Sequence, residues 1–396
     1  MTRAEAARPD AIRRHNLSLL LTQIHRDSAL TRAELTQRLD LSRSTIGALV
    51  ADLTDLELLQ ESVPSGGARA GRPSHLVGPR PDGPYAAAVD IDITHVTTAA
   101  VGIGGALLAK HVVELAVQPS SPQVVARHVI ESVIRLTATL PAGSWPVGIG
   151  VSVPGTVSRS DGVVEFAPNL VWRDEPFGAM LAAQAPPGLP VTIGNDADLA
   201  VLAEHLRGSG RDSDDVIYLL GRIGVGAGII VNGAPLRGHD GHSGEVGHNV
   251  FDPAGPPCHC GKRGCVESYI GENALLQLAG RQLTHTAEQV AAVFADARAG
   301  DERAAAAIRT VAEALGQTVA SLVNVLNPEK VILGGSLAAV LDFAPGQVAR
   351  SLELHTMATV RDSVRLCTPG LGEDSSLLGA AELAFARLLA DPLTRR

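Results

Sequence analysis

The stretch Gly244–Tyr269, GEVGHNVFDPAGPPCHCGKRGCVESY, brings three of the four cysteines of the chain and a histidine into one short segment. The four residues are His248, Cys258, Cys260 and Cys265. Three thiolates and an imidazole make a closed tetrahedral ligand set, which is typical of structural zinc and leaves no open coordination position for catalysis. The intervening glycines and prolines permit turns tight enough to bring four donors to one point. We therefore predict a structural Zn2+ site at these residues.

Two other interpretations of this segment are possible. His259 could replace His248 as the nitrogen ligand, although the chain would then have to turn back within three residues. The cysteines could instead form a disulfide, but only Cys367 lies elsewhere and no secretory leader is recognisable. Clustered cysteines in that setting are more typical of a metal site. Zinc is the interpretation that the spacing favours.

Two acids flank the predicted metal ligands. Glu245 lies three residues before His248, and Glu267 lies two residues after Cys265. A metal site that fixes its own flanks would hold these carboxylates rigidly, as a hydrogen-bonding site for a polyol requires. The alternative is that both are solvated surface acids.

The motif GEVGH followed by CHCGKRGCVESY resembles the signature of the ROK family, which groups bacterial sugar kinases with sugar-responsive repressors. The resemblance extends over most of the chain. It implies an α/β fold with a two-lobed, actin-like (ribonuclease H-like) domain of the sugar-kinase type.

Size and composition limit the possibilities further. The 396 residues fit two or three domains, and 45% of them are hydrophobic, which is ample for large cores. No uncharged apolar run reaches the ~18 residues of a membrane span, and the N-terminus lacks the apolar core of a signal peptide. We therefore expect a cytoplasmic protein without membrane contact. The net charge of −9 is uneven, because residues 1–84 are slightly basic relative to the rest, as expected for a nucleic-acid-binding segment.

The first 60 residues predict three helices. Apolar residues in Arg13–Arg26 have helical spacing. Thr31 and Glu34 form a capping-box pattern for a second helix that ends near Leu39. Ser42 can cap a third helix, for which we expect the segment 42–59.

Two short helices joined by a tight turn, the second opening with small polar and basic residues, indicate a helix-turn-helix. Residues 60–78 resemble the β-wing of a winged helix, and Arg69 and Arg72 lie among small residues there. The alternative is a three-helix packing module whose wing is only a linker. The predicted DNA-binding residues are Ser42, Arg43, Ser44, Thr45, Arg69 and Arg72.

The proline-rich stretch 79–84 separates this head from a region of alternating strands and helices. We predict a DNA-binding domain and linker at 1–84 and a sugar-kinase-like domain at 85–396. By the family resemblance, lobe one comprises about 85–196 with the C-terminal helix 375–390. Lobe two comprises about 197–374 with the zinc motif.

The resemblance also implies a sugar pocket. In VTIGNDADLA, Asn195 matches a sugar-contacting asparagine and Asp196 matches the catalytic base of the family, whereas an aspartate there could simply cap a helix. Gly194 and Asp198 depart from the family pattern. The sugar contacts carried over by resemblance are Asn169, Asn195, Asp196, Glu245, His248 and Glu267, whose amides and carboxylates suit paired hydroxyls.

The nucleotide side does not match the family kinases. Their Asp-x-Gly-Gly-Thr loop reads Asp90-Ile91-Asp92-Ile93-Thr94, so an acid and a bulky side chain replace both glycines. In the second phosphate loop, GRIGVGAGI, Arg222 and Ile223 replace Thr-Gly. Because phosphoryl transfer depends on positioning the phosphates, we predict that kinase activity has been lost and that Asp196 is a vestigial base.

The sequence thus predicts a sugar-responsive transcriptional repressor. Its expected partners are operator DNA, a sugar or sugar-phosphate effector, and further copies of itself in a homodimer or homotetramer. An ATP-dependent sugar kinase with an appended DNA-binding head is the alternative from the enzyme class. A third possibility is a DNA-binding protein whose pocket is vestigial and that responds to a protein partner.

Overall fold

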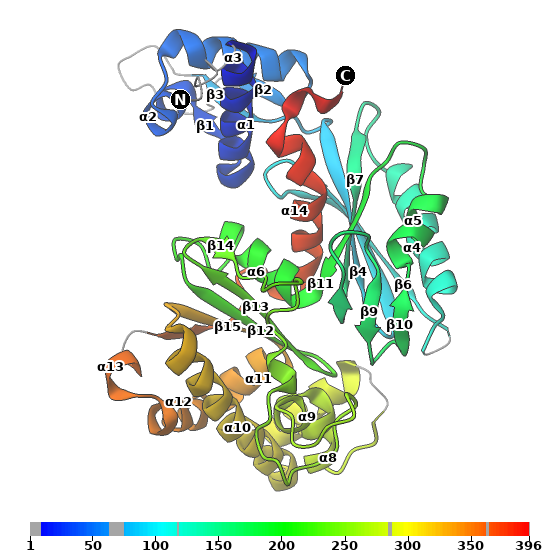
Figure 1. Ribbon diagram of the computed structural model, residues 1–396, viewed down its shortest axis with the longest axis vertical. Helices are drawn as coiled ribbons and strands as arrows, with labels where there is room; N and C mark the ends of the chain where they lie inside the picture. Colours follow the sequence, from blue (N-terminus) through cyan, green and yellow to red (C-terminus); the bar gives the residue numbers. More distant parts are fainter. Residues whose placement is uncertain (1–8, 63–74, 117–118, 284–286, 362–363, 396) are drawn as a thin grey trace, which may run out of the picture.

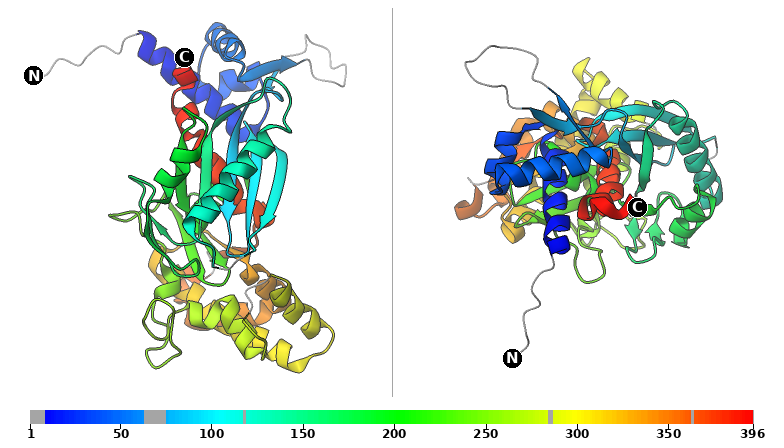
Figure 2. Two further views of the ribbon diagram at one scale, coloured as in Figure 1. Left: turned by 90° about the vertical axis from the view of Figure 1, so that its right-hand side faces the viewer. Right: turned by 90° about the horizontal axis from the view of Figure 1, so that it is seen from above.

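The computed structural model describes residues 9–62, 75–116, 119–283, 287–361 and 364–395. Three layers follow one another along its long axis: an N-terminal helical head, a first α/β layer around β4 and β7, and a second one around β12 and β13 (Figure 1). The C-terminus returns to the head (Figure 2). No helix in these ranges combines the length with the apolar character that a bilayer span requires.

The head has the predicted three helices and a small antiparallel sheet of order β1-β3-β2. Its helices are α1 (Pro9–Asp27), α2 (Arg32–Leu39) and α3 (Arg43–Asp55), and its strands are β1 (Leu30–Thr31), β2 (Leu59–Ser62) and β3 (Leu76–Pro79). The capping box is present, because Thr31 Oγ1 accepts from the Glu34 amide and the Glu34 carboxylate accepts from the Thr31 amide. Ser42 caps α3 as predicted.

The third helix is shorter than predicted. It ends at Asp55 rather than Leu59, because Glu57 takes the left-handed conformation, with φ of 59°, and Leu59 enters β2. Strands β2 and β3 are the two arms of the wing. The segment 63–74 between them, with Arg69 and Arg72, lies outside the described residues.

The first α/β layer has a five-stranded sheet of order β11-β7-β4-β5-β6. Its strands are β4 (Pro84–Ile91), β5 (His95–Gly102), β6 (Leu107–Glu114), β7 (Trp145–Val153) and β11 (Val191–Asn195). Alternate residues of β4 belong to different cores: Tyr85 and Val89 pack with α4 (Pro122–Thr137) and α5 (Phe177–Gln184). Ala86 and Ala88 pack on α14 (Ser375–Ala390), where small residues let the helix approach closely.

The second layer has a five-stranded sheet of order β14-β13-β12-β15-β16. Its strands are β12 (Val216–Gly221), β13 (Val225–Val231), β14 (Ala234–Pro235), β15 (Lys330–Gly335) and β16 (Arg365–Cys367). One face packs on the long helix α10 (Glu302–Leu326), together with shorter helices. These are α7 (Glu267–Ile270), α8 (Glu272–Leu278), α9 (Ala287–Arg298), α11 (Ser336–Phe343), α12 (Pro345–His355) and α13 (Ala358–Arg361).

Helix α6 (Asp196–Arg207) lies between the second sheet and α14, and α14 in turn packs on the first sheet. Ala197, Ala200 and Val201 face the second sheet, whereas Leu199 and Ala203 belong to the core around α14. Because α6 is buried on both of these faces, a movement of one layer displaces the other. The remaining described elements are a small sheet and three 3-10 turns. The sheet consists of β8 (Thr156–Val157), β9 (Val164–Ala167) and β10 (Trp172–Glu175), and the turns are Val246–His248, Gly372–Asp374 and Pro392–Arg395.

A buried polar cluster holds the head against the first layer. His25 of α1 is 1% exposed, and its Nε2 lies 2.7 Å from Glu382 Oε2 of α14. Arg207, the last residue of α6, donates from Nε to Glu382 Oε1 at 2.8 Å and from Nη1 to the His25 carbonyl at 2.7 Å. Burial alone would raise the pKa of Glu382, but the charges and hydrogen bonds of His25 and Arg207 lower it.

The Glu382→Ala substitution should destabilise the protein by about 3–5 kcal/mol, because it leaves the Arg207 guanidinium buried without its carboxylate. Urea denaturation followed by circular dichroism measures this change. Glu288→Ala, on an exposed part of α9, is the matched control and should have little effect. Equal stability of Glu382→Ala and the wild type would contradict a structural role of the cluster.

Candidate functional site

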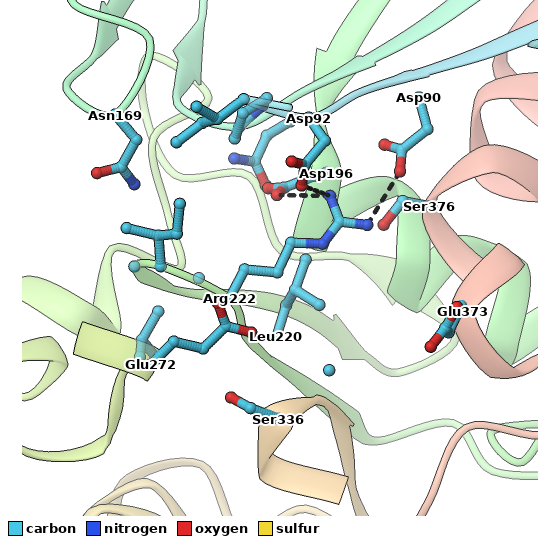
Figure 3. Close-up of a pocket in the computed structure, with 18 of the residues that line it drawn as sticks. Asp90, Asp92, Asn169, Asp196, Leu220, Arg222, Glu272, Ser336, Glu373 and Ser376 are labelled. Carbon is cyan, nitrogen blue, oxygen red and sulfur yellow. Dashed lines mark hydrogen bonds and ion pairs between the residues drawn. The ribbon is translucent and has the colours of Figure 1, made fainter. Parts of the chain in front are cut away.

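A cleft of about 660 Å³ opens between the two sheets (Figure 3). It is lined by residues from β4, from the ends of β11 and β12, from the start of α6, and from the segment that precedes α7. The structure brings all six predicted sugar-contacting residues to this cleft: Asn169, Asn195, Asp196, Glu245, His248 and Glu267. They come from positions almost 100 residues apart in the chain, so the convergence is a product of the tertiary fold.

Asn195 stands where β11 ends and α6 begins. Its Oδ1 accepts from the amides of Ala197 and Asp198 at 2.9 and 3.1 Å, which caps the helix. Its Nδ2 donates to the Gly155 carbonyl at 2.9 Å. An amide nitrogen has two hydrogens, so one N–H of Asn195 remains for a ligand.

Asp196 is the first residue of α6 and is 7% exposed. Burial raises its pKa to about 6; the Arg222 charge opposes this shift, and the Asp90 charge adds to it. The Ala197 amide donates to Asp196 Oδ1 at 2.9 Å, so helix capping, the simpler interpretation of this aspartate, is realised as well. The other oxygen, Oδ2, faces the cleft and Arg222.

Glu245, His248 and Glu267 form a connected row at the cleft wall. His248 Nε2 lies 3.9 Å from Glu245 Oε2, and His248 Nδ1 lies 3.9 Å from Glu267 Oε1. The side chain of Glu267 is 13% exposed and accepts from Cys258 Sγ at 2.9 Å. The predicted metal ligands and the predicted sugar-contacting acids are therefore direct neighbours.

The four predicted metal ligands converge in the metal loop, residues 248–265. One donor atom from each of His248, Cys258, Cys260 and Cys265 lies within 4.8 Å of all the others. The Cys260 and Cys265 sulfurs are 3.7 Å apart, and so are Cys258 Sγ and His248 Nδ1. Zinc–sulfur bonds of about 2.3 Å in a tetrahedron give edges of about 3.8 Å, so the donor spacing suits zinc.

The backbone of the metal loop explains why it can be so tight. Gly264 has φ of 67°, and a side chain there would overlap the Asp252 carbonyl. The Gly264 amide donates to Pro256 O at 2.7 Å, and the Cys258 amide donates to Lys262 O at 2.8 Å. His259 is exposed and is not part of the cluster, so the alternative nitrogen ligand is not realised.

The segment Asp90–Thr94, which corresponds to the first phosphate loop of the family kinases, uses backbone amides in hydrogen bonds of its own turn. The Asp92 amide donates to the His95 carbonyl at 2.9 Å, and the Thr94 amide donates to Asp92 Oδ1 at 3.1 Å. Ile93 between them is only 8% exposed. Two amides of this turn are thus already engaged, and a phosphate would find them occupied.

The glycines that survive in the second phosphate loop have a packing role. A side chain on Gly226 would contact Ala197, and one on Gly228 would overlap the Ala197 carbonyl. Both glycines therefore allow α6 to lie directly on β13. Their presence needs no nucleotide as an explanation.

Arg222 follows β12 and reaches across the cleft. From the sequence it is identified only as a departure from the phosphate loop of the family kinases. Its Nη2 donates to Asp90 Oδ2 at 2.9 Å, while Nη1 lies 4.0 Å from both Asp92 Oδ2 and Asp196 Oδ2 (Figure 3). Burial alone would lower the pKa of Arg222, but the charges of Asp90, Asp196 and Asp92 raise it, so the guanidinium stays charged. No local sequence pattern predicts these contacts.

The predicted DNA-contacting residues of α3 lie at its N-terminus. Arg43 and Ser44 are exposed. Ser42 Oγ accepts from the Thr45 amide at 3.1 Å and lies 2.8 Å from the hydroxyl oxygens of Ser44 and Thr45. A helix N-terminus with an exposed arginine and several hydroxyls suits phosphate and base contacts.

Comparisons with known proteins agree on one family. The model of the ROK family matches residues 86–387. The xylose repressor of Bacillus subtilis (strain 168) is 26% identical over 379 residues, which cover 96% of this chain and 97% of the repressor. The glucokinase of Streptomyces griseus in complex with glucose and AMPPNP is 28% identical, with a TM-score of 0.65, covering 76% of this chain and 99% of the glucokinase.

A solved ROK family transcriptional regulator, described as a homologue of the E. coli MLC protein, has the same fold over nearly the whole chain. It has a TM-score of 0.76 and 24% identity, and the match covers 96% of this chain and 98% of the regulator. The likeness therefore includes the head as well as both α/β layers.

The Asp196→Asn variant should be more stable than the wild type at pH 8, by up to about 3 kcal/mol. The raised pKa of Asp196 means that the folded state binds a proton more tightly than the unfolded chain. The free energy of unfolding of the wild type therefore falls as the pH rises from about 4 to about 6, and a neutral amide avoids this loss.

Urea denaturation at pH 4, 6 and 8 tests this dependence. The advantage of Asp196→Asn should shrink as the pH falls and disappear near pH 4, while the exposed control Asp342→Asn should show none at any pH. An Asp196→Asn variant that is less stable than the wild type at pH 8 would contradict the view that burial destabilises the ionised Asp196 carboxylate.

Proposed function

The chain belongs to the ROK family, and on that premise we propose that it is a sugar-responsive, DNA-binding transcriptional regulator that acts as a repressor. The predicted family and the two-lobed sugar-kinase fold are thereby confirmed. The family model begins at residue 86, behind the head, whereas the match to the xylose repressor covers 96% of the chain. The head is thus shared with a repressor.

The observation that carries this proposal is the position of α6 between the cleft and the head. Asn195 and Asp196 at its start line the cleft. Arg207 at its end holds His25 of the head. Twelve residues of helix span about 18 Å, so a displacement at the cleft would reach the head without an intervening flexible joint. A ligand shifts DNA binding only if it binds the two head positions with different affinity.

The cleft chemistry supports a sugar as the effector. Carboxylates and amides can satisfy the paired hydroxyls of a carbohydrate, and the six sugar-contacting residues supply both. We assign the two nitrogens of His248 to different tasks: Nδ1, beside Cys258, to the metal, and Nε2, beside Glu245, to the cleft. A structural zinc ion would then fix one wall of the sugar pocket.

We infer that kinase activity has been lost. The amides of the Asp92–Thr94 turn are engaged internally, Ile93 fills its centre, and Arg222 spans the space in front of Asp196. The alternative is an ATP-dependent sugar kinase with a DNA-binding head. It is favoured by Asp196, whose pKa of about 6 would suit a general base. Turnover of a sugar with magnesium-ATP, abolished in Asp196→Asn, would establish that alternative.

The DNA-reading surface is assigned to the start of α3 and to the wing. Ser42, Arg43, Ser44 and Thr45 would meet phosphates and base edges, and Arg69 and Arg72 would extend the contact. A winged helix usually reads two half-sites about one helical turn apart, so we propose a homodimer or homotetramer on the operator.

A sugar should change the affinity of the full-length protein for its operator by about fivefold or more. The operator is first selected from random duplexes, and binding is then measured by fluorescence anisotropy with D-xylose, D-glucose, D-mannose and N-acetyl-D-glucosamine. Arg43→Ala should weaken DNA binding about tenfold, and Asp196→Asn should remove the sugar response but keep DNA binding. Arg298→Gln, on the exposed side of α9, should change neither.

Two results would count against the regulator. One is a protein that selects no DNA sequence. The other is an operator affinity that responds to no sugar, which would favour a vestigial pocket and a protein partner instead.

Metal analysis should find ~1 zinc ion per chain of wild-type protein. Cys260→Ser should lose the ion and the sugar response while the head still binds DNA, because the metal loop shapes the cleft and not the head. Cys367→Ser lies outside the cluster and is the control. A wild-type protein without metal, or a Cys260→Ser variant with unchanged metal content, contradicts the zinc assignment.

A further inference from the structure

Arg222 connects the two sheets inside the cleft. It belongs to the turn between β12 and β13 of the second sheet, and its amide donates to the Gly224 carbonyl at 2.9 Å, which fixes the turn. Its guanidinium donates to Asp90 of the first sheet, which Ser152 Oγ holds at 2.6 Å from the other side. A cation from the turn of the second sheet is thereby paired with a carboxylate of the first sheet.

One nitrogen of this guanidinium has no partner. Nη1 of Arg222 is buried, and the structure gives it no hydrogen bond; its two closest carboxylate oxygens, on Asp92 and Asp196, are 4.0 Å away. Arg222 lines the cleft, so Nη1 is the unsatisfied donor of the cleft wall. Leaving a buried donor unpaired is unfavourable, and an acceptor that enters the cleft would relieve this.

The geometry admits one oxygen atom that serves both groups. Two polar atoms 4.0 Å apart can each lie about 2.8 Å from a third atom placed at a right angle between them. At that position the oxygen accepts from Arg222 Nη1 and stands beside Asp196 Oδ2, which can only accept when ionised. A hydroxyl accepts and donates at once, so it satisfies both partners.

A phosphate group fits the same position poorly. The acids Asp90, Asp92, Asp196 and Glu272 surround Arg222, and burial together with the Asp92 charge raises the pKa of Glu272 to about 7. Among the described residues that line the cleft, the lysine and arginine side chains are those of Lys110 and Arg222. Lys110 pairs with Asp374, and Arg222 is shared by three carboxylates, so a phosphate dianion would meet mainly like charge.

We propose that Arg222 and Asp196 together form a hydroxyl-binding site that selects an unphosphorylated sugar as the effector. This deepens the proposed regulatory function and rests on it. The hydroxyl that a kinase of this fold would phosphorylate is instead held between a guanidinium and the former base. Arg222 is then a specificity-determining residue, because its charge is already balanced by the carboxylates of Asp90, Asp92 and Asp196, while the N–H groups of its Nη1 are still available to a neutral hydroxyl.

Isothermal titration calorimetry of the full-length protein tests the selectivity without any variant. The probes are D-glucose, D-mannose, D-xylose and N-acetyl-D-glucosamine, together with the 6-phosphates of the three hexoses and D-xylose 5-phosphate. The neutral sugar that binds should bind about 100-fold or more tightly than its own phosphate ester. A phosphate ester that binds as tightly as the neutral sugar, or more tightly, overturns the proposal.

Variants of Arg222 test the residue itself. Arg222→Gln should weaken binding of the neutral sugar about tenfold or more, since a hydrogen bond from a charged donor is lost. Arg222→Lys keeps the positive charge but not the forked shape of the guanidinium. Its affinity for the neutral sugar should lie between those of Arg222→Gln and the wild type. Arg298→Gln removes a surface guanidinium and is the matched control.

The outcomes separate this site from the proposed function. Unchanged sugar affinity in Arg222→Gln overturns the hydroxyl site and leaves a sugar-responsive regulator intact. A wild-type protein that binds none of the sugars or phosphate esters overturns both. Tight binding of a neutral sugar that Arg222→Gln weakens supports both.

Discussion

Helix α6 packs closely between the second sheet and α14, and this packing fixes the cleft relative to the head. On one side its backbone touches β13, where Gly228 is needed because a side chain would overlap the Ala197 carbonyl. On the other side it touches α14, where a side chain on Gly379 would overlap Leu199. Because backbone meets backbone on both sides, α6 cannot tilt without moving its neighbours. The first turn of this helix lines the cleft, and its last turn holds the head.

The charges in the cleft support the proposed role in recognition rather than in phosphoryl transfer. A kinase needs free amides and a space in which polyphosphate and metal can lie beside the base. Here the Asp92–Thr94 turn uses its amides internally, and Arg222 places a permanent cation at the position that would have to be open. The same change that opposes turnover leaves a hydrogen-bonding site for a neutral ligand.

The metal loop and the cleft share residues, which couples their stability. Glu267 accepts from Cys258 and also lines the cleft, and His248 presents one nitrogen to each side. A metal ion would replace the proton of Cys258, and its positive charge would then hold the Glu267 carboxylate beside the thiolate. The metal loop therefore also forms part of the wall of the proposed sugar site.

Features that depend on residues close together in the chain could be predicted from the sequence. The Thr31–Glu34 capping box and the cluster of predicted metal ligands are local in the sequence; the structure contains the capping box and brings the four predicted ligands together. The end of α3 was placed too late, because the left-handed Glu57 has no strong local signal. The sugar-contacting residues came from family resemblance, since nothing local indicates that Asn169 and Glu267 would meet.

Only the tertiary structure decided what connects these parts. Arg222 pairs with Asp90 across 132 residues of sequence, and His25 pairs with Glu382 across 357. Neither partner can be inferred from spacing, because each pair depends on how two separate layers are stacked. The sequence determined the elements and the metal ligands, whereas the stacking of α6 decided which charges share a cleft and which helix reaches the head.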